Sequence, residues 1–139
     1  MVDAISGIRD QLLEIRASGE SVSIEGGATK SFMGRKSHGT TLSVSNHFGV
    51  IAYEPTELVL TVRAGTPLES VESMVTEQGQ MLGFEPPAYG KQATIGGTIA
   101  CGVSGPRRAF AGASRDFTLG AKVMNSDGET LNFGGRVIK

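Results

Sequence analysis

The sequence predicts an α+β domain organised around glycine-rich loops. Two segments with helical apolar spacing are interspersed with short segments in which apolar and polar residues alternate, as they do in strands. Two glycine clusters, at 26–31 and 94–108, interrupt this pattern, and each places glycines beside Lys or Arg. Backbone N–H groups can converge on diphosphate oxygens only where no Cβ intervenes, and a nearby cation offsets the charge. We therefore expect a domain built around a nucleotide cofactor.

Composition and charge narrow the possible classes. The 139 residues suffice for one domain with a core. A net charge of −1 gives no electrostatic case for binding nucleic acid or an anionic membrane. The single cysteine, Cys101, cannot form an internal disulfide, which favours a reducing, cytoplasmic compartment. With only His38 and His47 besides, the sequence argues against a zinc or iron–sulfur site in this chain.

The first segment reads as an amphipathic helix. Ile5, Ile8, Leu12 and Ile15 recur at helical spacing, and Gly19 follows as a stop signal. The N-terminus lacks the basic and apolar regions of a signal peptide. No apolar stretch approaches the roughly 20 residues that a membrane-spanning helix needs.

Short alternating segments predict strands after this helix. They cover residues 21–25, 40–44, 50–53 and 58–64, with turns expected at 46–49 and 54–56. The first glycine cluster directly follows the first of these strands. It is therefore expected to form a loop at a strand end.

A second helix is expected to begin near Pro67. Thr66 has the character of an N-cap, and Glu69 that of its partner in a capping box. Gly79 follows as a C-terminal stop. The apolar stripe predicted to face the core comprises Leu68, Val71 and Val75.

The C-terminal part is predicted to be irregular until residue 116. Pro86-Pro87 begins a long loop over 86–115, of the kind that is functional or disordered inside a compact domain. From 116 the alternation resumes through Val123, and Asp127-Gly128 predicts a turn into a further strand at 131–133.

Each cluster also has a plain structural interpretation. Residues 26–31 match neither a Walker A loop nor a Gly-x-Gly-x-x-Gly fingerprint, and could be a simple turn between strands. Residues 94–108 could be a packed turn of small residues, with Cys101 a small buried residue. Arg107 and Arg108 would then be solvated, whereas the alternative places them near the cofactor. Arg115 and Asp116 could form a surface ion pair.

The order of motifs resembles a known family. Gly26-Gly-Ala-Thr-Lys30, Gly65-Thr-Pro-Leu68, the segment 79–87 and Thr94-Ile-Gly-Gly-Thr-Ile-Ala100 resemble the FAD-binding domain of the vanillyl-alcohol oxidase and p-cresol methylhydroxylase (PCMH) group. Segments 103–108, 112–116 and 134–139 narrow the resemblance to FAD-binding subunits of bacterial glycolate oxidases.

The resemblance implies a PCMH-type FAD-binding domain of two α/β subdomains. Residues 1–90 would form the first, and 91–139 the start of the second. Similar proteins continue beyond the stretch that matches 137–139, so the domain is expected to be C-terminally truncated here.

The resemblance also implies which residues bind FAD. Ala28 departs from the group, which often has Gly there, and this matters if the position needs a positive φ. No His lies in either cluster, so FAD is expected to be non-covalent. No catalytic residue and no metal ligand is assigned. The implied cofactor-binding residues are Gly26, Gly27, Ala28, Thr29, Lys30 and Ser31 in the first loop; Pro87; Thr94, Ile95, Gly96, Gly97, Ala100, Ser104 and Gly105 at the diphosphate and inner flavin face; Gly112, Arg115 and Asp116; and Val137 and Ile138 toward the adenine.

The implied activity is that of an FAD-dependent oxidoreductase subunit in a glycolate or 2-hydroxy-acid oxidase complex. Its expected partners are a larger FAD-containing catalytic subunit and an iron–sulfur subunit, through which it would attach peripherally to the inner face of the cell membrane. This segment alone is expected to be inactive. Two alternatives stay open: another FAD-linked hydroxy-acid enzyme such as a D-lactate dehydrogenase, and a non-catalytic scaffold subunit with the same fold.

Overall fold

A computed structural model describes residues 4–36 and 38–135. Its elements, in chain order, are α1 (Ala4–Ser18), β1 (Val22–Glu25), β2 (Thr40–Ser43), β3 (Val50–Glu54), the 3-10 helix η1 (Pro55–Glu57), β4 (Val59–Val62), α2 (Leu68–Glu77), α3 (Ile95–Cys101), α4 (Arg108–Ala111), α5 (Ser114–Phe117), β5 (Gly120–Met124) and β6 (Thr130–Gly134).

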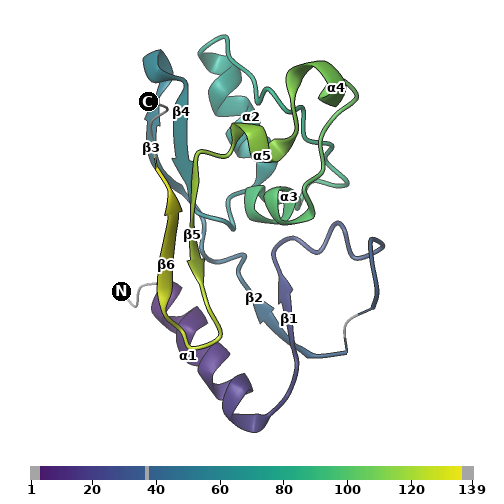
Figure 1. The fold of residues 1–139 in the computed structure, drawn as a ribbon, viewed down its shortest axis with the longest axis vertical. Helices are drawn as coiled ribbons and strands as arrows, with labels where there is room; N and C mark the ends of the chain where they lie inside the picture. The colour runs from purple at the N-terminus through teal and green to yellow at the C-terminus, as the bar shows by residue number, and fades with distance from the viewer. Residues whose placement is uncertain (1–3, 37, 136–139) are drawn as a thin grey trace.

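The described strands pair two by two, as Figure 1 shows. β1 and β2 are parallel, whereas β3 with β4 and β5 with β6 are antiparallel. Helices and small sheets thus share one chain, which confirms the α+β class. All four strands predicted before residue 65 are present within a residue or two of their expected bounds.

α1 confirms the helix predicted from the isoleucine and leucine spacing. It ends before Gly19, whose φ of 74° is the left-handed conformation that glycine adopts most easily. Its polar side chains bind the turn between β5 and β6: Arg9 Nε donates to Gly128 O at 3.1 Å, and Arg16 forms an ion pair with Asp127. The first helix and the last hairpin are therefore held together (Figure 1).

α2 supplies much of the core. Leu68, Val71 and Val75 are buried, as the apolar stripe predicted. The predicted capping box is wrong, because Thr66 Oγ1 is engaged elsewhere. It donates to Arg63 O at 2.6 Å and accepts from the Gly49 amide at 3.0 Å, so it fixes the approach to the helix instead of capping it.

The predicted long loop over 86–115 is also wrong, since α3 and α4 lie within it and α5 begins at its end. α5 continues to Phe117, so the strand expected from residue 116 begins only with β5 at Gly120. Small residues in α3 gave no apolar periodicity, but they let its backbone pack closely. Leu68 N–H donates to Ala93 O at 2.8 Å, and Ile95 N–H to Thr66 O at 2.9 Å, so this segment runs antiparallel to the start of α2. Tertiary hydrogen bonds therefore stabilise a helix that propensity alone disfavours.

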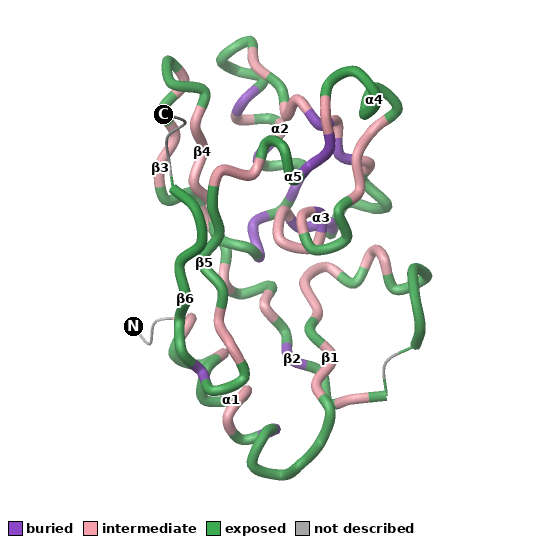
Figure 2. Tube along the Cα trace, in the orientation of Figure 1, coloured by how far each residue is buried: buried purple, intermediate pink, exposed green. Residues whose placement is uncertain are grey.

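Burial concentrates around α2, α3 and the segment between them (Figure 2). Thr98 of α3 is fully buried, with its hydroxyl donating to Thr94 O at 2.9 Å. Cys101 at the end of the same helix is exposed, which corrects its predicted burial. The predicted turn at Asp127-Gly128 does join β5 to β6, and most of this hairpin is exposed.

Candidate cofactor-binding site

The first glycine cluster forms a loop of backbone amides at the end of β1. It follows β1, where the parallel pairing with β2 ends. The loop turns back on itself, with Ser31 N–H donating to Ala28 O at 3.4 Å, and Ala28 has a left-handed φ of 52°. Within the described part of the chain, the amides of residues 26–30 donate to no protein acceptor. Successive amides around a left-handed residue form a concavity suited to an anion.

The segment around Gln92 and Thr94 packs closely against Gly26 and Gly27, and leaves no room for a side chain at either position. A Cβ at Gly27 would lie 1.5 Å from Gln92 O, and a Cβ at Gly26 would lie 2.5 Å from Thr94 Oγ1. A side chain at Gly27 would therefore require the backbone to move, and one at Gly26 would require the Thr94 side chain to move. The structure therefore brings the two glycine clusters, distant in sequence, together at Gly26 and Thr94.

The first turn of α3 lies beside the amide loop but offers no free amide donors at residues 95–97. The amides of Ile95 and Gly96 donate to carbonyl oxygens between β4 and α2 at 2.9 and 2.8 Å, and Gly97 N–H donates to Thr94 Oγ1 at 3.2 Å. Bare amides were expected in both clusters, but the amides of residues 95–97 in the second cluster donate to acceptors within the protein. Gly97 still leaves space, because a Cβ there would have only Thr94 Oγ1 within 4 Å.

Lys30 adds a cation beside the amide loop. Its Nζ lies 3.5 Å from Thr98 Oγ1 and 5.9 Å from the centroid of the Tyr89 ring. No ion pair among the described residues includes Lys30. Its charge is therefore available to an anion on the amide loop. Together the donors and the cation fit the diphosphate of a dinucleotide.

A second group of predicted residues lies around α4 and α5. Ser114 N–H donates to Ser104 Oγ at 2.9 Å, and Ala113 N–H donates to Asp116 Oδ2 at 2.7 Å. Gly105 N–H donates to Phe84 O at 2.9 Å. These hydrogen bonds join residues of this region to one another and to Phe84, and so fix the backbone conformation here. The group comprises Ser104, Gly105, Gly112, Arg115 and Asp116.

Arg107 and Arg115 each have an acidic partner within the chain. Arg107 Nε lies 3.0 Å from Glu85 Oε2, and this hydrogen bond lowers the pKa of the Glu85 carboxyl. Arg115 Nε lies 3.6 Å from Asp116 Oδ1, and both side chains are largely exposed. Each of these two arginines therefore forms an ion pair with an acidic side chain of the same chain.

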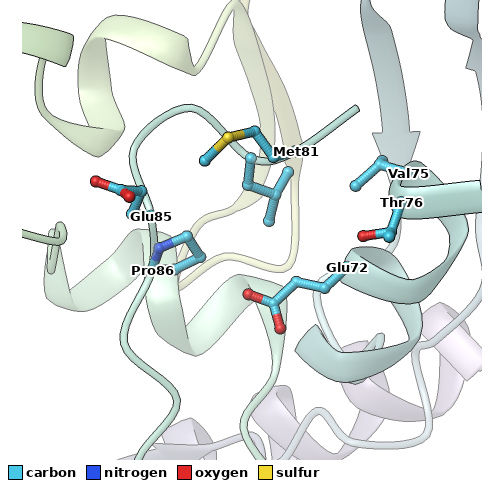
Figure 3. Close-up of a pocket in the computed structure, with 7 residues that line it drawn as sticks. Glu72, Val75, Thr76, Met81, Glu85 and Pro86 are labelled. Atoms are coloured by element: carbon cyan, nitrogen blue, oxygen red, sulfur yellow. The ribbon is translucent and has the colours of Figure 1, made fainter. Parts of the chain in front are cut away.

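A shallow pocket lies away from the predicted residues, between α2 and the segment that follows it (Figure 3). In the close-up, Glu72 and Glu85 approach it from opposite sides. Burial and the neighbouring Glu69 raise the pKa of Glu72. None of the predicted cofactor residues lines the pocket, whose lining residues are Glu72, Val75, Thr76, Met81, Leu82, Glu85 and Pro86.

Four other predicted residues stand apart from these groups. Pro87 is half-buried and Ala100 is exposed on α3, while Val137 and Ile138 lie outside the described residues. In the described chain, no cluster of His, Cys, Asp or Glu is arranged to hold a metal ion. None of the described helices is long and apolar enough to cross a membrane.

The sequence did not single out three residues that complete the loop. Gln92 crosses Gly27, Thr98 meets the Lys30 ammonium, and Tyr89 places its ring near the same ammonium. These are tertiary contacts across more than 50 residues. No local pattern could have indicated Tyr89 or Gln92, whereas Thr98 lies in a cluster already suspected.

Comparisons with known proteins agree with this geometry. The chain is 50% identical over 116 residues to the glycolate oxidase subunit GlcE of Escherichia coli (strain K12). The matched stretch covers 84% of this chain and 33% of that protein. The chain is 34% identical over 87 residues to a D-2-hydroxyglutarate dehydrogenase of Xanthomonas citri pv. viticola, covering 63% and 18%. The chain thus spans about a third or less of the length of these relatives.

The fold has a counterpart among solved structures. An alkyldihydroxyacetonephosphate synthase superposes with a TM-score of 0.69 at 18% identity, covering 91% of this chain and 24% of that one. This supports the predicted PCMH-type fold. The sequence model of an FAD binding domain matches residues 4–134, which include both glycine clusters and the hairpin that follows them. This chain therefore belongs to the FAD-binding-domain family, and FAD is its cofactor.

Proposed function

We propose that this chain is the FAD-binding segment of a subunit in a complex that oxidises glycolate or a related small 2-hydroxy acid. The observation that carries the proposal is the run of amides at 26–30, which donate to no acceptor among the described residues, with Lys30 beside it and α3 behind it. The 50% identity to a glycolate oxidase subunit supports the substrate class.

In this proposal the chain binds and orients FAD. The amides of 26–30 and the Lys30 ammonium hold the diphosphate, while Gly97 leaves room for close approach. The group from Ser104 to Asp116 completes the cleft, with residues 1–90 and 91–139 belonging to two subdomains. Bound FAD supplies two-electron chemistry, and the protein tunes and positions it. Because neither cluster contains a His, attachment is non-covalent.

The proposal extends to partners. A larger flavoprotein subunit and an iron–sulfur subunit would exchange electrons with this one, and would hold it peripherally at the cell membrane. A second candidate is another FAD-linked hydroxy-acid dehydrogenase. It is favoured by the 34% identity to a D-2-hydroxyglutarate dehydrogenase and by 33% identity over 76 residues to a D-lactate dehydrogenase of Archaeoglobus fulgidus.

The test uses the full-length protein that contains this segment. We expect it to show flavin absorbance, and acid should release the flavin into the supernatant. Flavin that precipitates with the polypeptide would contradict non-covalent binding. Reduction of the flavin, in the complex with its copurifying subunits, should be faster with glycolate than with D-lactate or D-2-hydroxyglutarate. The reverse order favours the second candidate, and a protein that binds no FAD is a scaffold.

Lys30→Met is the sharpest single variant for the binding step. The substitution removes the cation and keeps an apolar chain of similar length. We expect FAD affinity to fall about tenfold or more, because hydrogen bonds between charged groups are strong. Lys91→Met, at an exposed lysine, is the matched control and should leave the affinity unchanged. Equal affinities for Lys30→Met and the wild type would remove the Lys30 assignment.

A further inference from the structure

Two aromatic side chains lie beside Lys30 in an arrangement that burial does not explain. The rings of Phe32 and Tyr89 meet edge to face, with centroids 5.2 Å apart. Phe32 is 67% exposed and Tyr89 is 46% exposed, so the pair removes little apolar surface from water. The Lys30 ammonium lies 5.9 Å from the Tyr89 centroid, within reach of a cation–π attraction.

The segment that carries Tyr89 is fixed against the amide loop at two further points. The carbonyl of Gln92 crosses Gly27, and a Cβ at Gly90 would lie 3.4 Å from Thr29 Cγ2. The Ala93 amide also donates to Gly90 O at 3.1 Å, which closes a turn just after the tyrosine. The segment that carries Tyr89 therefore lies against the amide loop, and the Phe32 ring contacts the Tyr89 ring from the other side of that loop's sequence.

We propose that Tyr89, supported by Phe32, is a positioning residue that holds the Lys30 ammonium beside the amide loop for the cofactor diphosphate. A lysine side chain loses considerable rotational freedom when it binds an anion. The ring face and Thr98 Oγ1 restrict that freedom before binding, and preorganisation of this kind raises affinity. The inference rests on the proposed function, since it concerns the same diphosphate.

The chemistry of the pair predicts which part of Tyr89 matters. No hydrogen bond among the described residues involves the Tyr89 hydroxyl, so the ring face alone should act. In the full-length protein, Tyr89→Phe should keep FAD affinity within about twofold of the wild type. Tyr89→Leu removes the ring and should weaken FAD binding about three- to fivefold, the range of an exposed cation–π contact.

A double-mutant cycle distinguishes positioning from a general structural role. In a Lys30→Met background, Tyr89→Leu should have almost no further effect on the dissociation constant, because the ring has no ammonium to hold. Tyr89→Leu alone should also make affinity less dependent on salt concentration. ADP is a second probe, since it carries the diphosphate without the flavin ring and should show the same pattern. Tyr53→Leu, at the other tyrosine, is the control and should leave FAD affinity unchanged.

The outcomes separate this inference from the function on which it rests. A wild-type protein that binds neither FAD nor ADP overturns both. If the wild type binds FAD but Tyr89→Leu weakens binding equally in both backgrounds, the positioning role is wrong and the proposed function stands. The role is also wrong if Tyr89→Phe is as weak as Tyr89→Leu, because the hydroxyl and not the ring would then matter.

Discussion

Ala28 adopts a backbone conformation that an alanine can reach only at a cost in stability. Its φ of 52° lies in the left-handed region, where an L-residue with a Cβ is disfavoured by about 1–2 kcal/mol. The sequence raised the question whether this position needs a positive φ, and the structure answers it. The loop keeps the conformation because Gly27 is held beneath Gln92. Its geometry is therefore imposed by packing and not by Ala28 itself.

We expect Ala28→Gly to stabilise the fold by about 1 kcal/mol, since relief of the left-handed strain exceeds the added entropy of the unfolded chain. FAD affinity should be equal or higher. Ala100→Gly, at an exposed position of helix α3, is the control and should destabilise by about 1 kcal/mol. Urea unfolding of both variants measures these opposite signs. Destabilisation by Ala28→Gly would show that the loop tolerates a left-handed alanine without strain.

The ion pair between Glu85 and Arg107 predicts how the free energy of unfolding depends on pH. The hydrogen bond from Arg107 lowers the Glu85 pKa below its ordinary 4.5. A carboxyl whose pKa is lower in the folded state stabilises the fold above the unfolded value, and this stabilisation is lost as pH falls through the folded pKa. We therefore expect Arg107→Gln to reduce the free energy of unfolding at pH 7 and to have no effect well below pH 4.5. Arg108→Gln should show no such pH-dependent difference.

At the scale of elements, a helix or strand was predicted correctly where its own residues carry an apolar periodicity. α1 and α2 have apolar stripes, and the β5–β6 hairpin has alternation and an Asp-Gly turn, so all three were predicted. α3 has glycines and small residues, and its stability comes from hydrogen bonds to Thr66 and Ala64 that lie far away in sequence. The Thr66 cap failed for the same reason, because Gly49 and Arg63 compete for its hydroxyl.

The adjacent glycines of α3 should respond differently to the same substitution. A Cβ at Gly96 would lie 2.6 Å from Ala64 Cβ, so Gly96→Ala should destabilise the fold by about 1–3 kcal/mol through overpacking. Gly97→Ala meets only Thr94 Oγ1 at 3.2 Å and should fold normally. It should still weaken FAD binding, and Gly97→Val more so. Thermal unfolding and flavin titration measure the two effects separately. Unchanged FAD affinity in both Gly97 variants would assign Gly97 to packing alone.

At the scale of the whole molecule, the described chain has a small core and large apolar exposure. The core lies around α2 and α3, whereas the β5–β6 hairpin is bound mainly through its turn to α1 (Figures 1 and 2). The order of motifs predicted the family, and the resemblance assigned both glycine clusters to the cofactor. The direct contact between the clusters was not predicted. The sequence could not predict this contact, because Gln92, Thr98 and Tyr89 approach the first cluster only in the tertiary structure.

The exposed hairpin predicts how the 139-residue chain behaves by itself. Val123 pairs with Leu131, and Ala121 with Phe133, so these four residues share one face. Val123, Leu131 and Phe133 are 45%, 41% and 57% exposed. An apolar face at a two-stranded sheet invites pairing with another chain. We therefore expect the separately expressed chain to self-associate, with an apparent mass in size-exclusion chromatography that rises with concentration.

The hairpin itself supplies a matched test of this expectation. Phe133→Lys places a charge on the apolar face and should shift the chain toward monomer. Asn132→Lys adds the same charge on the opposite face, because side chains alternate along a strand, and should leave the association unchanged. Sedimentation of the three chains in one buffer compares them directly. If both lysine variants dissociate equally, net charge and not this face controls the association. A wild-type chain that stays monomeric at all concentrations would show that the exposed pairs Val123–Leu131 and Ala121–Phe133 are too small a surface to drive it.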